Sequence, residues 1–224
     1  EVTALGMGNE PFILDGTSMA APQVAGLAAL LVDCNPILWI WPEALKPIIM
    51  ASAVHSIEPP SVMQFDDGVD DKDGAGAIDA AMALTTAENR ETADESYIPC
   101  WWGVSITTTN PPVGGALNRY FHVAAGGRVR VAISWFSNAS SDYSSDSLDT
   151  DLDLRVFGPD DQGLWRSLSI SNNYEIVEFV APTSGRYRIE VKKYSASENE
   201  NSLGIAWVSL RWDIYLPLIM REYE

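Results

Sequence analysis

The chain has 224 residues, 46% of them hydrophobic and 20% charged, which is enough apolar material for a packed core and excludes a disordered chain. Its 14 basic residues stand against 31 acidic ones, a formal net charge of −17. This excess argues against nucleic acid and anionic membranes as partners and favours divalent cations. The longest apolar runs, at 24–32 and 214–220, are too short to cross a bilayer, and the opening residues do not form a signal peptide. We therefore expect no nucleic-acid partner and no membrane span.

Charge and residue composition both change near residue 96. Residues 1–95 hold 16 acids and three bases in Ala-, Leu- and Met-rich runs typical of helices. Residues 96–224 hold 15 acids and 11 bases in short alternating runs rich in Val, Ile, Trp and Tyr. A polar stretch without apolar period separates them. The sequence therefore predicts an α+β chain of two units, divided into a helical unit at 1–87, a linker at 88–96, a β unit at 97–216 and a tail at 217–224.

The first informative segment begins at residue 16. From Ser18 onward the sequence predicts a helix that is apolar on nearly every face, as in a helix buried within a domain. Gly16 and Thr17 form the turn into this helix, and we expect Pro22 in its first turn. A serine at a helix N-terminus has an unpaired backbone N–H and a dipole that favours negative charge, which suits a nucleophile whose attack creates an oxyanion. On position alone, the alternative is an ordinary N-cap.

The full string Gly-Thr-Ser-Met-Ala-Ala-Pro at 16–22 resembles the nucleophile motif of the subtilisin-like serine proteases. Residues 41–53 are similar to the next helix of that family, and residues 74–84 to the start of the last helix of its catalytic domain. The resemblance implies that residues 1–87 are the C-terminal third of such a domain. It also implies that Ser18 is the acyl-enzyme nucleophile of a secreted endopeptidase acting on proteins or peptides.

The same resemblance places the triad Asp and His, and the oxyanion-hole Asn, before the serine, and only 17 residues precede Ser18. Both histidines, His55 and His122, follow it. Without a base, a serine hydroxyl is a poor nucleophile near neutral pH. We therefore expect this chain alone to be inactive, with the Asp and His supplied by an N-terminal portion of the protease domain. Without the strands of that portion, the apolar surface of the Ser18 helix would lie exposed.

Two acidic stretches are candidate cation sites. The stretch at 66–74 lacks the EF-hand carboxylates at loop positions 1 and 12, which leaves an irregular calcium loop or a solvated loop. Farther along, strand alternation places Asp149, Asp151 and Asp153 on one face. These three acids either share a cation or keep an exposed strand edge soluble.

The β unit also resembles a known family. The patterns at 151–156, 172–175 and 181–191 look like those of the jelly-roll and pre-peptidase C-terminal domains that follow many secreted subtilases. The resemblance implies a jelly-roll-like antiparallel β-sandwich stabilised by calcium. Carried over residue by residue, it gives four candidate calcium ligands: Asp151, Asp153, Asn173 and Glu175.

The residue pattern of the β unit agrees with a sandwich, because its strands are short and its turns polar. Strands at 119–123 and 128–135 flank Ala125-Gly126-Gly127, which predicts a hairpin. Trp135 and Trp207 alternate with core positions, so we expect them in the core rather than on a carbohydrate-binding surface.

Two functions remain open. One is part of a secreted subtilisin-like serine endopeptidase, and the other is a non-catalytic, calcium-stabilised β-sandwich module beside an inactive protease remnant. The intact Gly16-Thr17-Ser18 turn favours the first, since a decayed remnant has no physical reason to keep it. Cys34 and Cys100 could pair only with each other or remain two thiols.

Overall fold

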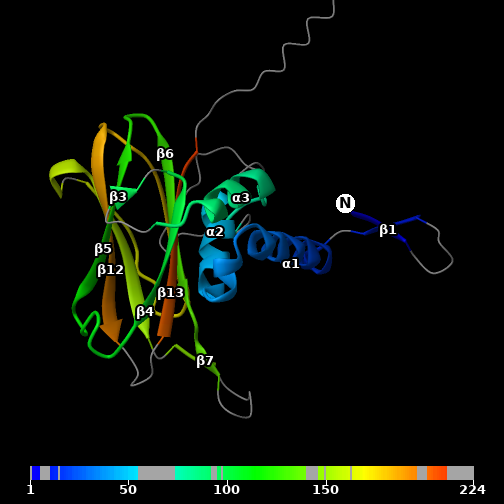
Figure 1. Ribbon diagram of the computed structural model, residues 1–224, viewed down its shortest axis with the longest axis horizontal. Helices are drawn as coiled ribbons and strands as arrows, with labels where there is room; N and C mark the ends of the chain where they lie inside the picture. Colours follow the sequence, from blue (N-terminus) through cyan, green and yellow to red (C-terminus); the bar gives the residue numbers. More distant parts are fainter. Residues whose placement is uncertain are drawn as a thin grey trace, which may run out of the picture.

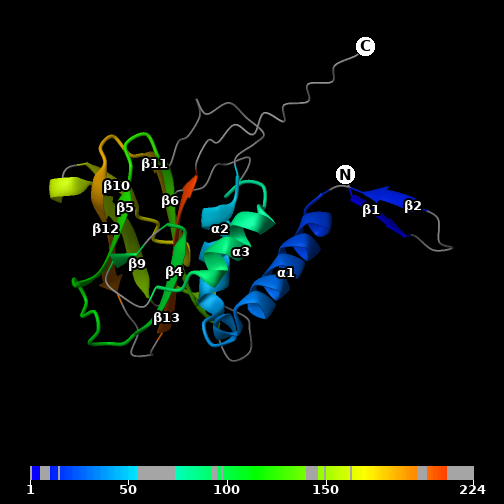
Figure 2. The same ribbon diagram turned by 45° about the horizontal axis from the view of Figure 1, so that its top comes forward.

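The structure is a computed structural model that describes residues 2–5, 11–14, 16–54, 74–91, 95–96, 98–139, 146–148, 150–161, 163–195 and 201–210. Helices gather on one side of a β-sandwich (Figures 1 and 2). The chain is therefore a helical unit followed by an antiparallel β-sandwich, as the sequence predicts.

The helical unit opens with a two-stranded pair, β1 (Val2–Leu5) and β2 (Pro11–Leu14). Its helices are α1 (Thr17–Cys34), the 3-10 turns η1 (Pro36–Trp39) and η2 (Pro42–Ala44), α2 (Leu45–Ser52) and α3 (Ala80–Glu88). Because α1 begins at Thr17, Pro22 lies in its second turn rather than the predicted first turn. Because proline has no backbone N–H, the Ser18 carbonyl lacks the helical hydrogen bond that residue 22 would otherwise donate. The Asp79 side chain caps α3 by accepting the Met82 N–H at 3.0 Å.

The sandwich consists of two sheets. In order, the first contains β10 (Leu164–Ser167), β9 (Asp151–Phe157), β12 (Gly185–Ser195), β5 (Ala116–Val123) and β3 (Glu95–Ser96). The second contains β11 (Tyr174–Val180), β6 (Arg128–Trp135), β13 (Asn201–Leu210) and β4 (Cys100–Ile106). All of these pairs are antiparallel except β3 with β5. A short pair, β7 (Asn138–Ala139) with β8 (Asp146–Ser147), and the turn η4 (Pro159–Asp161) lie outside the two sheets.

The two sheets bury alternate side chains between them. Trp135 and Trp207 are 1% and 0% exposed within this inner cluster, which confirms the prediction of core packing. The Trp165 and Phe179 rings stack across the gap between the sheets, with their centroids 4.1 Å apart. Aromatic stacking of this kind adds to the free energy of burial and fixes how the sheets face each other.

The predicted hairpin around Gly126 is wrong. β5 pairs with β12 in the first sheet, whereas β6 pairs with β11 and β13 in the second. The turn therefore carries the chain from one sheet to the other. Its register is held by Ala181, whose carbonyl accepts the Gly126 N–H and whose N–H donates to the Gly127 carbonyl, both at 2.8 Å.

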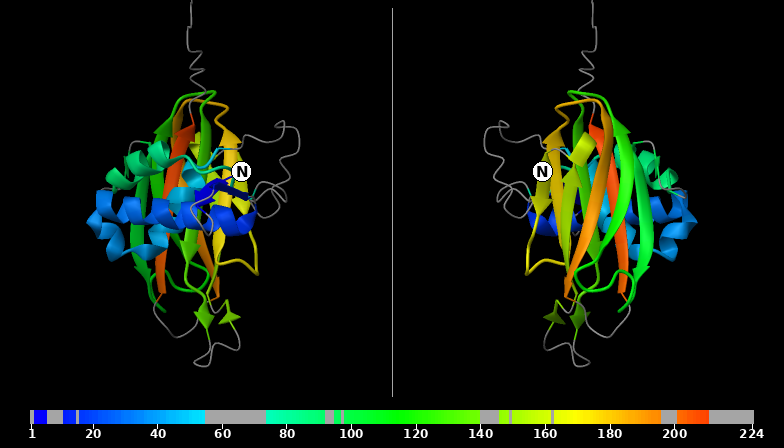
Figure 3. Two further views of the ribbon diagram at one scale, coloured as in Figure 1. Left: turned by 90° about the vertical axis from the view of Figure 1, so that its right-hand side faces the viewer. Right: turned by 90° about the vertical axis from the view of Figure 1, so that its left-hand side faces the viewer.

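The α-helices cover the outer face of the second sheet, and no described α-helix covers the outer face of the first (Figure 3). A second apolar cluster joins helices and sheet. It holds Leu27, Leu31, Leu38, Ala44, Ile48, Met50, Ala51, Ala83 and Ala87 from the helical unit and Trp101, Ala132, Ile176, Ala206 and Val208 from the strands. This second cluster is therefore a core shared by both units.

The residues that lead from α3 into the sandwich are held by backbone hydrogen bonds. The Glu91 N–H donates to the Trp101 carbonyl at 2.8 Å, and the Trp101 N–H donates to the Asn89 carbonyl at 3.0 Å. Glu91 is also buried. This connection is therefore anchored to the sheet at residues 89–91.

Candidate functional site

Ser18 lies in the first turn of α1, with its side chain exposed. The N-cap is Gly16, with φ 115° and no side-chain oxygen to offer. The Gly16 carbonyl accepts the N–H groups of Met19 and Ala20 at 3.0 and 3.2 Å. Because the first N–H groups of a helix have no partner within it, the Ser18 N–H belongs to a set able to stabilise an oxyanion.

The rest of α1 is largely exposed. Leu27 and Leu31 are buried, whereas Leu30 is 55% exposed, and this confirms the expected exposure of the helix. With 18 residues and a mean hydropathy of 1.3, α1 is also long and apolar enough to cross a membrane by length and composition. The longest uninterrupted apolar runs did not indicate such a helix, and the expectation of no membrane span stays a prediction.

The structure does not bring a histidine to Ser18 among the residues that it describes. His122 lies on β5 with its side chain exposed and pairs in register with Arg186 of β12, in the sheet without helices. His55 lies outside the described residues. The serine and a general base therefore do not meet in the described part of this chain.

Three of the predicted calcium ligands lie at the corner where β9 and β10 approach β11. Asp151 and Asp153 lie on β9, and Leu152 between them faces the core. Glu175 lies on β11 and is fully buried. Asp149 lies outside the described residues.

Glu175 is the most perturbed of these acids. Burial raises its pKa from 4.5 to about 7, with smaller raising contributions from Asp153 and Asp151 that the bonds from Ser167 and Ser169 oppose. The Ser167 hydroxyl donates to one carboxylate oxygen, and the Ser169 N–H donates to the other at 2.7 Å. Burial also raises the pKa of Asp151 and of Asp153, in the latter case against the lowering effect of Arg155. Burial therefore disfavours the charged form of all three carboxyl groups.

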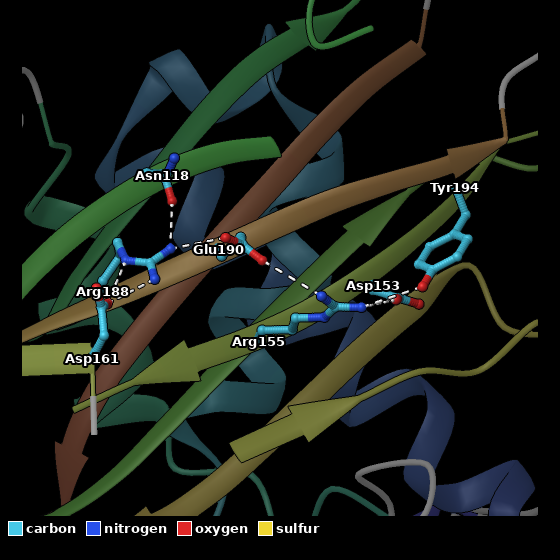
Figure 4. A network of polar contacts seen from close by, with 7 residues as sticks. All are labelled: Asn118, Asp153, Arg155, Asp161, Arg188, Glu190 and Tyr194. Carbon is cyan, nitrogen blue, oxygen red and sulfur yellow. Dashed lines mark hydrogen bonds and ion pairs between the residues drawn. The ribbon is translucent and has the colours of Figure 1, made fainter. Parts of the chain in front are cut away.

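Asp153 belongs to a polar network on the outer face of the first sheet (Figure 4). Arg155 pairs with Asp153 at 3.1 Å and with Glu190 at 3.8 Å, and Arg188 pairs with Glu190 at 2.8 Å. The network contains Asn118, Asp153, Arg155, Asp161, Arg188, Glu190 and Tyr194. One oxygen of Asp153 is therefore already neutralised by a guanidinium.

The fourth predicted ligand, Asn173, is also engaged. Its Oδ1 accepts a hydrogen bond from Lys46 Nζ at 3.1 Å, and its carbonyl accepts the Trp135 N–H at 3.1 Å. It lines a polar pocket of about 210 Å³ together with Ser137, Leu148, Ser171 and Asn172. A cationic ammonium on Oδ1 opposes a metal ion at the same oxygen.

These four residues do not form a complete calcium site. Within the part of the chain that the structure describes, no group of three His, Cys, Asp or Glu side chains is close enough to hold one ion. The atom that fits a cation is Asp151 Oδ1, which is buried without a hydrogen-bond partner. An uncompensated buried carboxylate oxygen carries a desolvation penalty that a cation would relieve.

Both cysteines are free thiols. Cys100 belongs to the cluster between the sheets, and its Sγ contacts the Asn89 carbonyl at 2.9 Å. Cys34 lies at the end of α1 and contacts Glu88 Oε1 at 3.6 Å. Trp101, the neighbour of Cys100, faces the helices, so Cys100 faces away from them and from Cys34.

Sequence reasoning missed the residues that support these sites. Ser167 and Ser169 hold Glu175, and Arg130 and Glu178 form a buried ion pair beneath α2. An arginine inside the apolar run at 128–135 was an available signal, because a charged side chain in a buried strand is paired as a rule.

Comparison with known proteins agrees with both resemblances. Residues 9–76 match the model of the Subtilase family, and residues 120–193 match that of the Bacterial pre-peptidase C-terminal domain. The chain is thus similar to the subtilase family over residues 9–76 and to the bacterial pre-peptidase C-terminal domain over residues 120–193.

The individual proteins that the chain resembles share less than a third of its residues over the aligned parts. The chain is 28% identical over 102 residues to the CO(2)-response secreted protease of Arabidopsis thaliana, covering 43% of this chain and 13% of that protein. The pre-peptidase C-terminal domain of a Bacillus anthracis collagenase covers 52% of this chain and 95% of its own, at 15% identity and a TM-score of 0.34. The Bacillus licheniformis lipase BlEst2 covers 53% of this chain and 23% of its own, at 17% identity and a TM-score of 0.30.

Proposed function

We propose that the chain is part of a secreted serine endopeptidase that hydrolyses proteins or peptides, with Ser18 as the acyl-enzyme nucleophile. The observation that carries the proposal is an exposed serine in the first turn of a long helix, within the segment that matches the subtilase family. Free N–H groups and the helix dipole would stabilise the oxyanion formed by attack at a peptide carbonyl.

The triad Asp and His are proposed to come from an N-terminal portion of the protease domain. Exposed apolar side chains on α1 and at residues 39–40 support this, because the sheet of such a portion would bury side chains of this kind. Leu30, Trp39 and Ile40 are 55%, 79% and 73% exposed. The hydroxyl of Ser18 would transfer its proton to that histidine while attacking the carbonyl carbon, and the returned proton would leave with the amine. This chain alone is expected to be inactive.

The proposal is tested with a tagged fluorophosphonate on natively produced protein, followed by a denaturing gel and intact mass. We expect a labelled species near 24.5 kDa if the N-terminal portion is a separate fragment, or label on a larger band if it is continuous. Ser18→Ala should abolish labelling, and Ser171→Ala, at another exposed serine, should leave it unchanged. Absence of label, or label that survives Ser18→Ala, would overturn the assignment.

A second candidate is a non-catalytic module stabilised by calcium, and the orphaned Asp151 Oδ1 is the observation in its favour. In this proposal Asp151 and Glu175, two of the four candidate ligands, contribute oxygen atoms together with Asp149, which lies outside the described residues. Calcium would then raise the melting temperature of the chain, magnesium would not, and Asp151→Asn would remove most of the effect. An unchanged melting temperature in millimolar calcium would reject calcium at this corner.

A further inference from the structure

The outer face of the second sheet is shaped to receive the helical unit. Several of its outward side chains are small or apolar, including Ala132, Ala206 and Val208. At Gly204 the approach is closest, since an added Cβ would lie 2.4 Å from Ala44 Cα and 2.5 Å from the Glu43 carbonyl oxygen. Only glycine allows the backbone of η2 to lie directly against β13 at this distance.

A buried charged side chain of the second sheet reaches across this interface into the helical unit. Arg130 of β6 is 1% exposed, and its Nη1 donates to the carbonyls of Ala53 at 2.6 Å, Ala75 at 2.9 Å and Met50 at 3.3 Å. Its Nε donates to Glu178 of β11 at 2.8 Å. Glu178 neutralises the charge, so the guanidinium can be buried while its remaining donors reach the helical unit.

The three carbonyls belong to two segments. Met50 and Ala53 lie at the C-terminal end of α2, where a cation is favoured by the helix dipole. Ala75 lies just before Ala77, whose backbone forms a two-way bridge with Val54 at 2.8 Å. Arg130 therefore holds both ends of the segment at 55–73, whose own residues lie outside those described.

The helix that carries Ser18, α1, packs against α2, whose C-terminal end is held by Arg130. α1 contacts α2 and α3, and α2 contacts β6 and β13. Buried residues of α1, α2 and α3 belong to the same cluster as the strand residues. A displacement of the α2 end from Arg130 would therefore be transmitted to the helices beneath α1.

We propose that the β-sandwich is the structural base of the helical unit, and that Arg130 is the positioning residue that fastens the end of α2 and residues 75–77 to it. The two units then unfold as one cooperative body rather than as a protease segment with a separable appendage. The further consequence, that the sandwich positions Ser18, rests on the proposed function.

Native-state hydrogen exchange of the full chain, followed by mass spectrometry in increasing urea, tests this. Peptides from α2 and β13 should lose protection together, within about threefold of each other in exchange rate. Arg130→Met should accelerate exchange of α2 by about 100-fold, since it removes one partner of a buried ion pair. Arg130→Lys should restore part of the protection through Glu178. Arg128→Met, which removes the other partner of Glu178 at 2.9 Å, should change α2 exchange less than about threefold.

Loss of α2 protection while the strands stay protected in the wild-type chain would overturn the proposal, even if Arg130→Met fails to fold. Equal effects of the Arg130 and Arg128 variants would also overturn it. Fluorophosphonate labelling is a separate measurement, so failure of the nucleophile assignment would leave the exchange result unaffected.

Discussion

Replacing the buried Glu175 with glutamine should remove much of the pH dependence of the chain's stability. The pKa of Glu175 rises to about 7 in the folded state from an ordinary value of 4.5. The folded protein therefore binds more protons than the unfolded chain between these values, and stability falls as the pH rises through this window. By linkage, the raised pKa of Glu175 lowers the free energy of unfolding by less than about 1 kcal/mol at pH 5 and by about 3 kcal/mol at pH 8.

Glutamine is isosteric and stays neutral, so the stability difference between Glu175→Gln and wild type should grow by about 2.5 kcal/mol from pH 5 to pH 8. Urea unfolding monitored by tryptophan fluorescence, in chelator-containing buffer at several pH values, measures this difference. Glu88→Gln on the exposed end of α3 controls for the loss of one formal charge. A difference that stays constant across the pH range would refute the reasoning.

Gly204→Val should lower the free energy of unfolding by about 3 kcal/mol, because the new side chain meets the backbone of Ala44; thermal unfolding measures the loss, and a normal melting temperature would contradict the tight packing there. Gly26→Ala, whose Cβ meets nothing within 4 Å, should stabilise the exposed α1 by up to about 1 kcal/mol in the same assay. Asp79→Ala should cost about 1 kcal/mol through loss of the α3 cap, and Asp79→Asn should recover most of it.

The sequence predicted those features that depend on residues close together in the chain. The string around Ser18 specified a helix start, and alternation within β6 and β13 placed Trp135 and Trp207 in the core. The candidate calcium ligands were grouped by resemblance alone, and because no three acidic, His or Cys side chains among the described residues are close enough to hold one ion, that grouping stays a prediction. Local pattern was sufficient here because strand and helix periods decide which face is buried.

Features that depend on distant pairing were not predicted. The Gly126 turn has the composition of a hairpin, but composition does not say which sheet each flanking strand joins. The shared core was missed for a related reason, although β13 carries Gly204, Ala206 and Val208 on what would be its solvent face. Small and apolar residues on both faces of a strand indicate that both faces are covered.

The core that the helices share with the second sheet also sets an order of events during synthesis. Residues 17–88 leave the ribosome before β13, the strand at Asn201–Leu210 on which α2 and η2 pack. More than a hundred residues separate α3 from β13, which at ordinary elongation rates is roughly 6 to 23 s. Throughout that interval the helix face that packs on the sandwich lacks β13, so a nascent chain is more exposed to aggregation than the finished protein. Chaperone capture of arrested nascent chains should therefore peak before residue 201 emerges and fall once β13 is in place.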